Sequence, residues 1–146
     1  MIAPPETGRH PGERGSLAVF VVLFSVAVLV LAGLLVDGGA QINARLRAGD
    51  IAEQAARAAA DAIDVERLRA TGEVRIAGGS QACGRAREVV RNHREAGAAL
   101  TRCTVAGGAQ RVTTQVRIEW RAFFLTIIGF TGGTMTAEAS AGPRTR

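Results

Sequence analysis

The stretch from Ser16 to Val36 constrains the fold of this chain more than any other part of the sequence. It contains no charged residue, and its only polar side chains are those of Ser16 and Ser25. A helix of about 21 residues is about 30 Å long, which matches the hydrocarbon core of a bilayer. Such a helix also satisfies its own backbone hydrogen bonds inside lipid. We therefore predict a transmembrane helix that is retained as an anchor.

Two other interpretations of this stretch are open at the level of sequence. A helix that is apolar on every face also suits a protein core, although little chain is available here to surround it. A cleaved secretory signal has an apolar region of about 7–15 residues, and its best cleavage site here would use Gly38 and Ala40. We favour the anchor because the apolar stretch is longer than that of a typical signal.

The flanking sequence differs in character on the two sides of the anchor. Residues 1–15 are rich in Pro and Gly, which predicts a disordered cytoplasmic leader. Residues 37–70 are rich in Ala and lack Pro, and their apolar positions recur mostly at helical spacing. We expect a helical extension that continues the anchor as a rod, with two helices broken at Gly38 and Gly39 as the alternative.

Residues 71–142 carry the pattern of a small α+β domain, and residues 143–146 are expected to form a loose tail. A helix is predicted at residues 81–96, with Ser80 as its N-cap. Short strands are predicted at residues 73–77, 99–106 and 134–141. The fold class is therefore α+β, with a long N-terminal helix packed on a small antiparallel sheet and one further helix.

The clearest alternation in the chain predicts another strand, with one apolar face that is buried against the long helix. The residues of this face are Val112, Thr114, Val116, Ile118 and Trp120. The apolar run at residues 123–130 is too short to cross a bilayer. It predicts either a buried helical turn or a segment that dips into the membrane surface.

Cys83 and Cys103 are the two cysteines of the chain. They form no CxxC motif, and because a structural zinc site needs about four ligands we expect no metal. A helix packed back on its own strand would bring them close enough for a disulfide, which would persist in an oxidising compartment. The alternatives are a thiol–imidazole site with His93 and a pair of buried free thiols.

Charge and motif content exclude several classes of function. The net charge of +5 permits contact with nucleic acid or anionic lipid. The basic residues, all Arg, alternate with acidic ones, and only 4% of residues are aromatic, so we expect no nucleic-acid partner. We find no paired carboxylates, phosphate loop or metal cluster, and therefore predict neither an enzyme nor a cofactor.

Three segments carry a resemblance to a known family. They are Arg-Gly-Ser-Leu-Ala-Val-Phe (14–20), Ala-Gly-Leu-Leu-Val-Asp-Gly-Gly (32–39) and Asp-Ile-Ala-Glu-Gln-Ala-Ala-Arg-Ala-Ala-Ala-Asp (50–61). Over residues 14–64 the chain resembles the TadE/TadG-like proteins of the Flp (tight adherence) pilus assembly system. The resemblance implies a type IV pilin-like architecture. It also implies a membrane-anchored component of a pilus or related secretion apparatus, either minor pilin-like or an assembly factor.

The resemblance further implies partners, location and processing. The partners would be the membrane and other subunits of the apparatus, contacted through the anchor and rod. The C-terminal domain would be extracytoplasmic, an orientation that the arginines flanking the anchor do not fix. Prepilin peptidase would cut between Gly15 and Ser16. Many relatives carry Glu at the fifth mature position, where this chain has Phe20, which also suits an uncut assembly component. The alternative function is a membrane-anchored binding module unrelated to pili.

Overall fold

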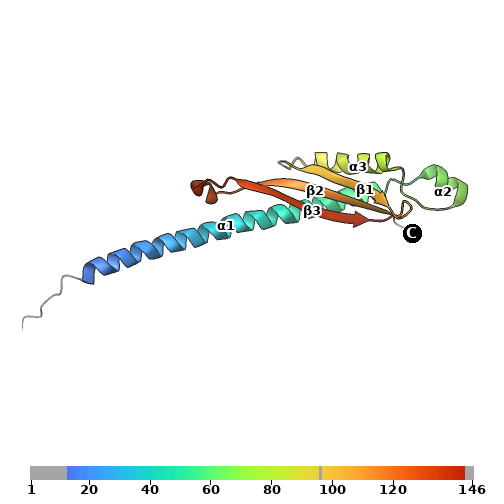
Figure 1. The fold of residues 1–146 in the computed structure, drawn as a ribbon. Helices are drawn as coiled ribbons and strands as arrows, with labels where there is room; N and C mark the ends of the chain where they lie inside the picture. The colour runs from blue at the N-terminus through green and yellow to red at the C-terminus, as the bar shows by residue number, and fades with distance from the viewer. Residues whose placement is uncertain (1–12, 96, 144–146) are drawn as a thin grey trace, which may run out of the picture.

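The computed structural model is a long helix, α1, with a small α+β domain folded on its C-terminal half (Figure 1). The structure describes residues 13–95 and 97–143. The predicted α+β class is confirmed, with a three-stranded antiparallel sheet as the β component. Most of the leader and of the predicted tail lie outside the described residues.

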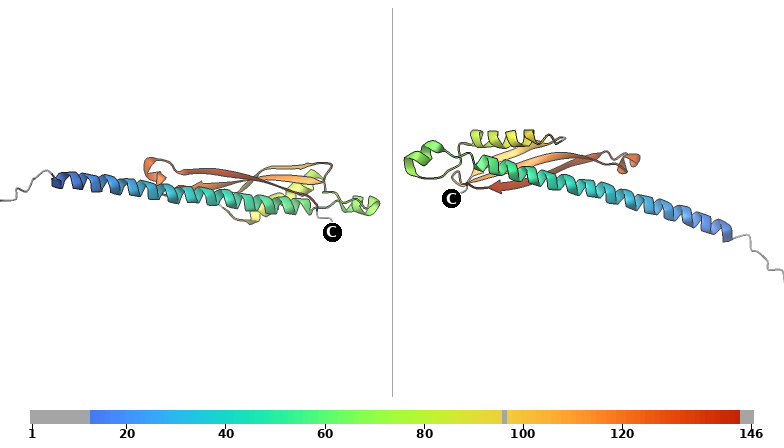
Figure 2. Two further views of the ribbon diagram at one scale, coloured as in Figure 1. Left: turned by 90° about the horizontal axis from the view of Figure 1, so that it is seen from below. Right: turned by 180° about the vertical axis from the view of Figure 1, so that it is seen from behind.

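Helix α1 (Glu13–Ala60) is continuous over 48 residues. It passes through Gly38 and Gly39 without interruption, so the alternative of two helices broken there is wrong (Figure 2). It also begins before Gly15 and Ser16, which therefore lie in its first turn.

The predicted end of the rod at residue 70 is corrected by the structure. Helix α1 ends at Ala60, and a separate short helix, α2 (Val65–Thr71), follows. The side chain of Asp64 caps α2 by accepting a hydrogen bond from the backbone N–H of Arg67 at 3.0 Å. Such a cap satisfies one of the unpaired N–H groups of a helix start, so Asp64 favours a new helix over continuation of the old one.

Two local predictions between α2 and the sheet are wrong. Residues 73–77 form no ladder strand, because the backbone N–H of Ile76 bonds to Ala109 and that of Ala77 bonds to Ala62, leaving a single isolated bridge. Helix α3 (Gly79–Asn92) is capped at its start by Gly78 and ends four residues before the predicted boundary. Ser80 thus lies inside the helix rather than at its N-cap.

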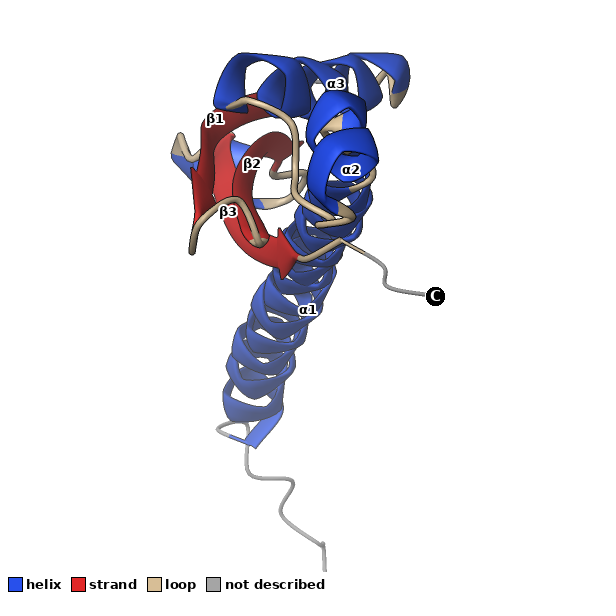
Figure 3. Cartoon of the chain, turned by 90° about the vertical axis from the view of Figure 1, so that its right-hand side faces the viewer, coloured by secondary structure: helices blue, strands red, loops and turns tan. Residues whose placement is uncertain are grey.

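The sheet consists of β1 (Ala99–Ala106), β2 (Arg111–Arg121) and β3 (Gly132–Ala141), in the order β1-β2-β3. The alternation of β2 is confirmed, since its predicted apolar face is buried throughout. The sheet curves around one side of α1, while α3 packs against both α1 and β1 (Figure 3).

The main core lies between the sheet, α3 and the C-terminal half of α1. On α1 it is built almost entirely from alanines at helical spacing, which allow the other elements to approach the helix closely. The buried residues of this half of α1 are Ala44, Ala48, Ile51, Ala52, Ala55, Ala56, Ala59 and Ala60. One polar contact crosses the core, where the hydroxyl of Thr114 donates to the carbonyl of Ala52 at 2.8 Å. As predicted, the apolar face of β2 is buried against the long helix.

Candidate functional site

Residues 17–32 of α1, the bare half of the helix, have no partner within the described part of the chain. Every side chain described from Leu17 to Ala32 is exposed, although nearly all are apolar. The one hydroxyl among them, that of Ser25, donates to the carbonyl of Val21 at 2.8 Å and so is satisfied within the helix. By length and composition α1 is able to cross a membrane. The alternative of a buried core helix is wrong, because this segment protrudes from the domain (Figure 2).

Asp37 marks the place where the bare half of α1 meets the domain. Its side chain is only 1% exposed and contacts the loop between β2 and β3. One carboxylate oxygen accepts hydrogen bonds from the backbone N–H groups of Phe123 at 2.8 Å and Phe124 at 3.3 Å. The other oxygen accepts from the N–H of Leu125 at 2.7 Å. Three donors from one loop thus converge on a single carboxylate.

The electrostatics of Asp37 follow from this arrangement. Burial of the carboxyl raises its pKa, but the three backbone hydrogen bonds outweigh burial and leave the pKa below its ordinary value of 3.8. Asp37 is therefore ionised at neutral pH, and its charge is neutralised locally by backbone dipoles. The sequence identified Asp37 only as part of a family motif. The available signal was its place as the first charged residue after the uncharged stretch that follows Arg14.

Gly33 provides a second contact one helical turn before Asp37. It is buried, and a Cβ added to it would lie 3.0 Å from the Cβ of Phe124. A residue with a side chain would therefore push this part of the loop away from the helix. Gly33 and Asp37 together bring the β2–β3 loop against α1 at the end of the predicted anchor.

The loop itself contains a short 3-10 helix, η1 (Leu125–Ile128), which ends at Gly129 in the left-handed conformation. Leu125 packs beside Trp120, Ala122 and Ala44 in a second, smaller core cluster. Phe123, Ile127 and Ile128 remain exposed. The alternative of a buried helical turn is thus only partly right, since the turn forms but most of its apolar side chains are not buried.

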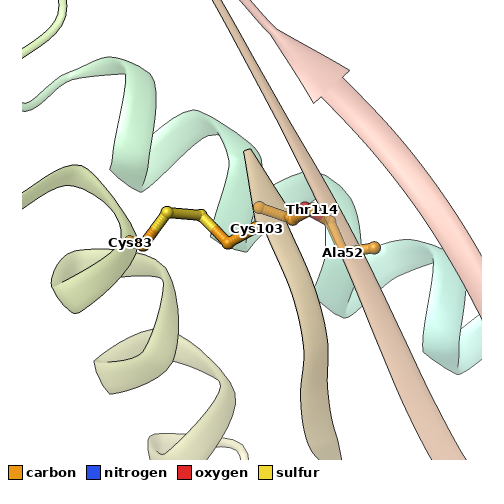
Figure 4. The surroundings of a disulfide bond; sticks show 4 residues. All are labelled: Ala52, Cys83, Cys103 and Thr114. Atoms are coloured by element: carbon orange, nitrogen blue, oxygen red, sulfur yellow. A yellow bond between two sulfur atoms is a disulfide. The ribbon is translucent and has the colours of Figure 1, made fainter. Parts of the chain in front are cut away.

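The two cysteines are joined as predicted. Cys83 on α3 and Cys103 on β1 form a disulfide with a Cα–Cα distance of 5.8 Å (Figure 4). The bond fastens the outer helix to an edge strand of the sheet. Because both thiols are consumed, neither the thiol–imidazole site nor the pair of free thiols is present.

His93 contacts a side chain of α1 and does not pair with a thiol. It follows the last residue of α3 and is half-buried. Its Nε2 atom lies 3.0 Å from the side-chain oxygen of Gln54 on α1, so the imidazole joins the two helices. Within residues 13–95 and 97–143, no three His, Cys, Asp or Glu side chains are grouped so that they could hold a metal ion.

The rod offers one open groove between α1 and β3. It combines apolar and charged side chains, with Ile42, Leu46 and Gly49 on the helix and residues 137–140 on the strand. Its floor is made partly of small residues, since Gly49 lies against Ala137. A second chain could therefore approach the helix closely along this groove.

The residues of the expected processing site lie at the start of α1. A Cβ added to Gly15 would meet no other atom within 4 Å, so this position is open. Phe20 is exposed, and its ring stacks on that of Phe24 with 6.1 Å between ring centroids. Position 20 therefore adds to the apolar surface of the bare half and supplies no carboxylate there.

A comparison with known protein families covers nearly the whole of α1. Residues 15–62 match the family described as "Putative Flp pilus-assembly TadE/G-like". The match begins in the first turn of α1 and ends just beyond its last residue, so it includes the bare half, Asp37 and the alanine-rich half. No curated protein and no solved structure matches the chain. The predicted TadE/TadG-like resemblance is thus confirmed for this N-terminal segment.

Proposed function

We propose that this TadE/G-like chain is a membrane-anchored component of a Flp/Tad-type pilus or related secretion apparatus, and that it acts by association rather than catalysis. The observation that carries the proposal is that the family match at residues 15–62 coincides with α1. The family is described as one of pilus assembly, and the N-terminal half of α1 presents apolar side chains that are exposed in the described chain.

In this proposal the division of the chain follows the two halves of α1. Ser16–Val36 is the anchor, and the helix beyond it is a rod that carries the domain. Exposed Val, Leu and Phe side chains of the anchor suit contact with lipid and with apolar helices of other subunits. The groove along Gly49 and β3 supplies a place outside the anchor for a neighbouring subunit.

We propose that the domain is extracytoplasmic. The support is the bond between Cys83 and Cys103, because reducing compartments do not maintain such bonds and oxidising ones do. The N-terminal residues would then remain on the cytoplasmic side, where prepilin peptidase could act between Gly15 and Ser16. The exposed Phe20 favours a minor or assembly role, since it lacks the carboxylate that would pair with the amine of a neighbouring subunit.

A membrane-anchored binding module unrelated to pili is the second candidate. The observation in its favour is that the sheet, α2 and α3 lie outside the matched residues 15–62. In that case the anchor would be shared with the family, while the domain would serve another partner.

Deletion of the coding sequence from its own cell tests the proposal. We expect loss of surface filaments or of secretion through the apparatus, and restoration by the wild-type chain. Val28→Arg should fail to restore the phenotype, whereas the matched variant Val28→Leu should restore it. Unchanged filaments and secretion after deletion would overturn the proposal and favour the binding module. N-terminal sequencing of the protein from the same membranes would show whether the chain begins at Ser16.

A further inference from the structure

The loop between β2 and β3, residues 122–131, exposes an unusual amount of apolar surface for its size. Phe123, Ile128 and Ile127 are 73%, 78% and 83% exposed, and no other large apolar side chain described is more exposed than Ile127. Exposed apolar groups that gather in one place mark a contact with a partner or a membrane. These three do not belong to the core clusters of the domain.

The position of this loop relative to α1 suggests what it contacts. Its backbone bonds to Asp37, and Phe124 packs on Gly33, which lies within the last turn of the proposed anchor. The views in Figures 1 and 2 agree that the loop lies at the end of the sheet nearer the bare half of the helix. If Ser16–Val36 spans the bilayer, the loop is therefore at the level of the membrane boundary.

The loop is held in this position by packing as well as by Asp37. Leu125 inserts beside Ala40 and Trp120, and the ring of Phe130 lies 6.0 Å from that of Trp120 between centroids. Anchoring of Leu125 leaves Ile127 and Ile128 on the surface of the same short helix. The exposed side chains are thus presented by an ordered turn.

The backbone of the loop satisfies most of its own hydrogen-bonding groups. The first three N–H groups after Ala122 bond to Asp37, and those of Ala122, Ile127, Gly129 and Phe130 bond to carbonyls within the loop. The hydroxyl of Thr126 donates to the carbonyl of Phe123 at 2.6 Å. Backbone that enters lipid must be paired in this way, because an unpaired N–H group there costs several kcal/mol.

The charges near the loop are compatible with a lipid boundary. No charged residue lies between Arg121 and Glu138 in the sequence. Arg121 is exposed at the start of the loop, where a guanidinium could reach lipid phosphates. The carboxylate of Asp37 is bonded to the loop, and its oxygens already accept three hydrogen bonds.

We propose that residues 122–131 form a second membrane contact, in which Phe123, Ile127 and Ile128 enter the outer edge of the bilayer beside α1. The proposal rests on the membrane anchoring of α1 proposed above. Its consequence is that the domain, which is packed on α1, sits at a fixed height and tilt relative to the membrane. Asp37 and Gly33 act as positioning residues, since they hold the loop against the helix at the required depth.

Lipid is favoured over a neighbouring subunit by the shape and continuity of the surface. The three side chains are exposed on a loop that packs on Gly33 through Phe124, and the apolar residues that follow Gly33 on the helix, Leu34, Leu35 and Val36, are exposed as well. Entry of such a turn into the bilayer requires no complementary cavity.

Depth-dependent quenching in vesicles tests the proposal directly. Full-length protein carrying Ile127→Cys, labelled with an environment-sensitive fluorophore, is reconstituted in phosphatidylcholine–phosphatidylglycerol vesicles. Lipids spin-labelled near the top of the acyl chain serve as quenchers. Because both native cysteines are bonded, the introduced thiol is the reactive one. Matched positions are Leu29→Cys in the anchor and Val65→Cys, an exposed apolar position on α2 at the far end of the rod.

We expect the label at position 127 to be quenched at least about half as strongly as the label at position 29, with little quenching at position 65. Quenching at position 29 without quenching at position 127 would overturn the proposal and leave the anchor intact. Absence of quenching at both positions would overturn the anchor and the loop contact together. A label at position 127 that is shielded from water but insensitive to lipid quenchers would indicate a protein partner, and would also overturn the proposal.

Discussion

Residues 17–36 and residues 37–60 belong to one uninterrupted helix, yet they use apolar side chains in opposite ways. In the first half, large Val, Leu and Phe side chains cover every face and remain exposed. In the second half, small Ala side chains occupy one face and are buried, while the exposed positions are mostly charged or amide side chains, with Ile42 and Leu46 as the large apolar exceptions. Hydrophobicity alone therefore does not identify the packed part of this helix. The size and periodicity of the apolar residues do.

The difference has an energetic consequence for the domain. Burial of an alanine removes only one methyl group from water. Because the hydrophobic effect is worth roughly 25 cal/mol per Å² of apolar area, each alanine contributes little free energy. A core built on an alanine face gains close approach of the sheet and α3, but gains modest stability from each residue. The disulfide between α3 and β1 adds a cross-link to this small core. The bare half needs no such support, because the helix bonds its own backbone.

The largest effect is expected from a charge in the bare half. Val28→Arg places a guanidinium near the middle of the proposed anchor, at a cost of about 2.5–3.5 kcal/mol on insertion scales. The variant should be depleted from the carbonate-washed membrane pellet relative to wild type. The matched variant Val28→Leu should stay in the pellet. Equal retention of Val28→Arg would mean that this half is not surrounded by lipid.

Removal of the disulfide is expected to have an effect of similar size, but on the stability of the domain instead of on membrane insertion. The double variant Cys83→Ala/Cys103→Ala should lose about 3 kcal/mol of domain stability, because the bond closes a loop with a sequence separation of 20. Urea unfolding of the detergent-solubilised protein, followed by the fluorescence of buried Trp120, measures the loss. Membrane retention should not change. Reduced membrane retention would show that the two halves are not independent.

A smaller effect is expected from enlarging one packed alanine. Ala55 is fully buried between α1 and the domain, so Ala55→Leu should overpack the core and cost about 1–3 kcal/mol. The same urea measurement applies. The same substitution at an exposed alanine of the bare half, Ala27→Leu, should leave domain stability within error of wild type. Equal stability of both variants would contradict the contrast between a packed and an unpacked half.

The smallest global effect is expected at the boundary between the halves. Asp37→Asn should release the loop locally, because it removes the charged carboxylate whose oxygens accept three backbone N–H bonds. The control is the same substitution at an exposed position, Asp50→Asn. Amide exchange at residues 123–125 should accelerate in the first variant alone. The pKa of Asp37 is lower in the folded state, so its contribution is present above pH 3.8 and is lost as pH falls through the depressed value. Exchange that is insensitive to both changes would contradict the assigned role.

Some elements of the structure have a clear local signal in the sequence, whereas others depend on contacts with distant parts of the chain. The apolar N-terminal half of α1 follows from its length and its lack of charge, whereas the helical rod and the strand β2 follow from local periodicity. The end of α1 at Ala60 is not evident in the sequence, because alanines give no stop signal and the one local sign of a new helix is the cap at Asp64. The role of Asp37 depends on a loop 86 residues away in sequence, which no local pattern can reveal. The alternation at residues 73–77 was too short to specify a partner strand.

Accessibility along α1 tests the central claim most directly. Leu23, Leu29, Ile42 and Leu46 are 65%, 67%, 63% and 61% exposed, so the protein itself shields them about equally. Single cysteines at these positions can be reacted with a water-soluble maleimide in membranes of cells that lack the other subunits of the apparatus, so that no neighbour covers the groove at positions 42 and 46, and again after detergent solubilisation and denaturation. The account predicts strong labelling at positions 42 and 46, and labelling at positions 23 and 29 only after solubilisation. Equal labelling of all four positions in intact membranes would contradict a helix divided between bilayer and domain.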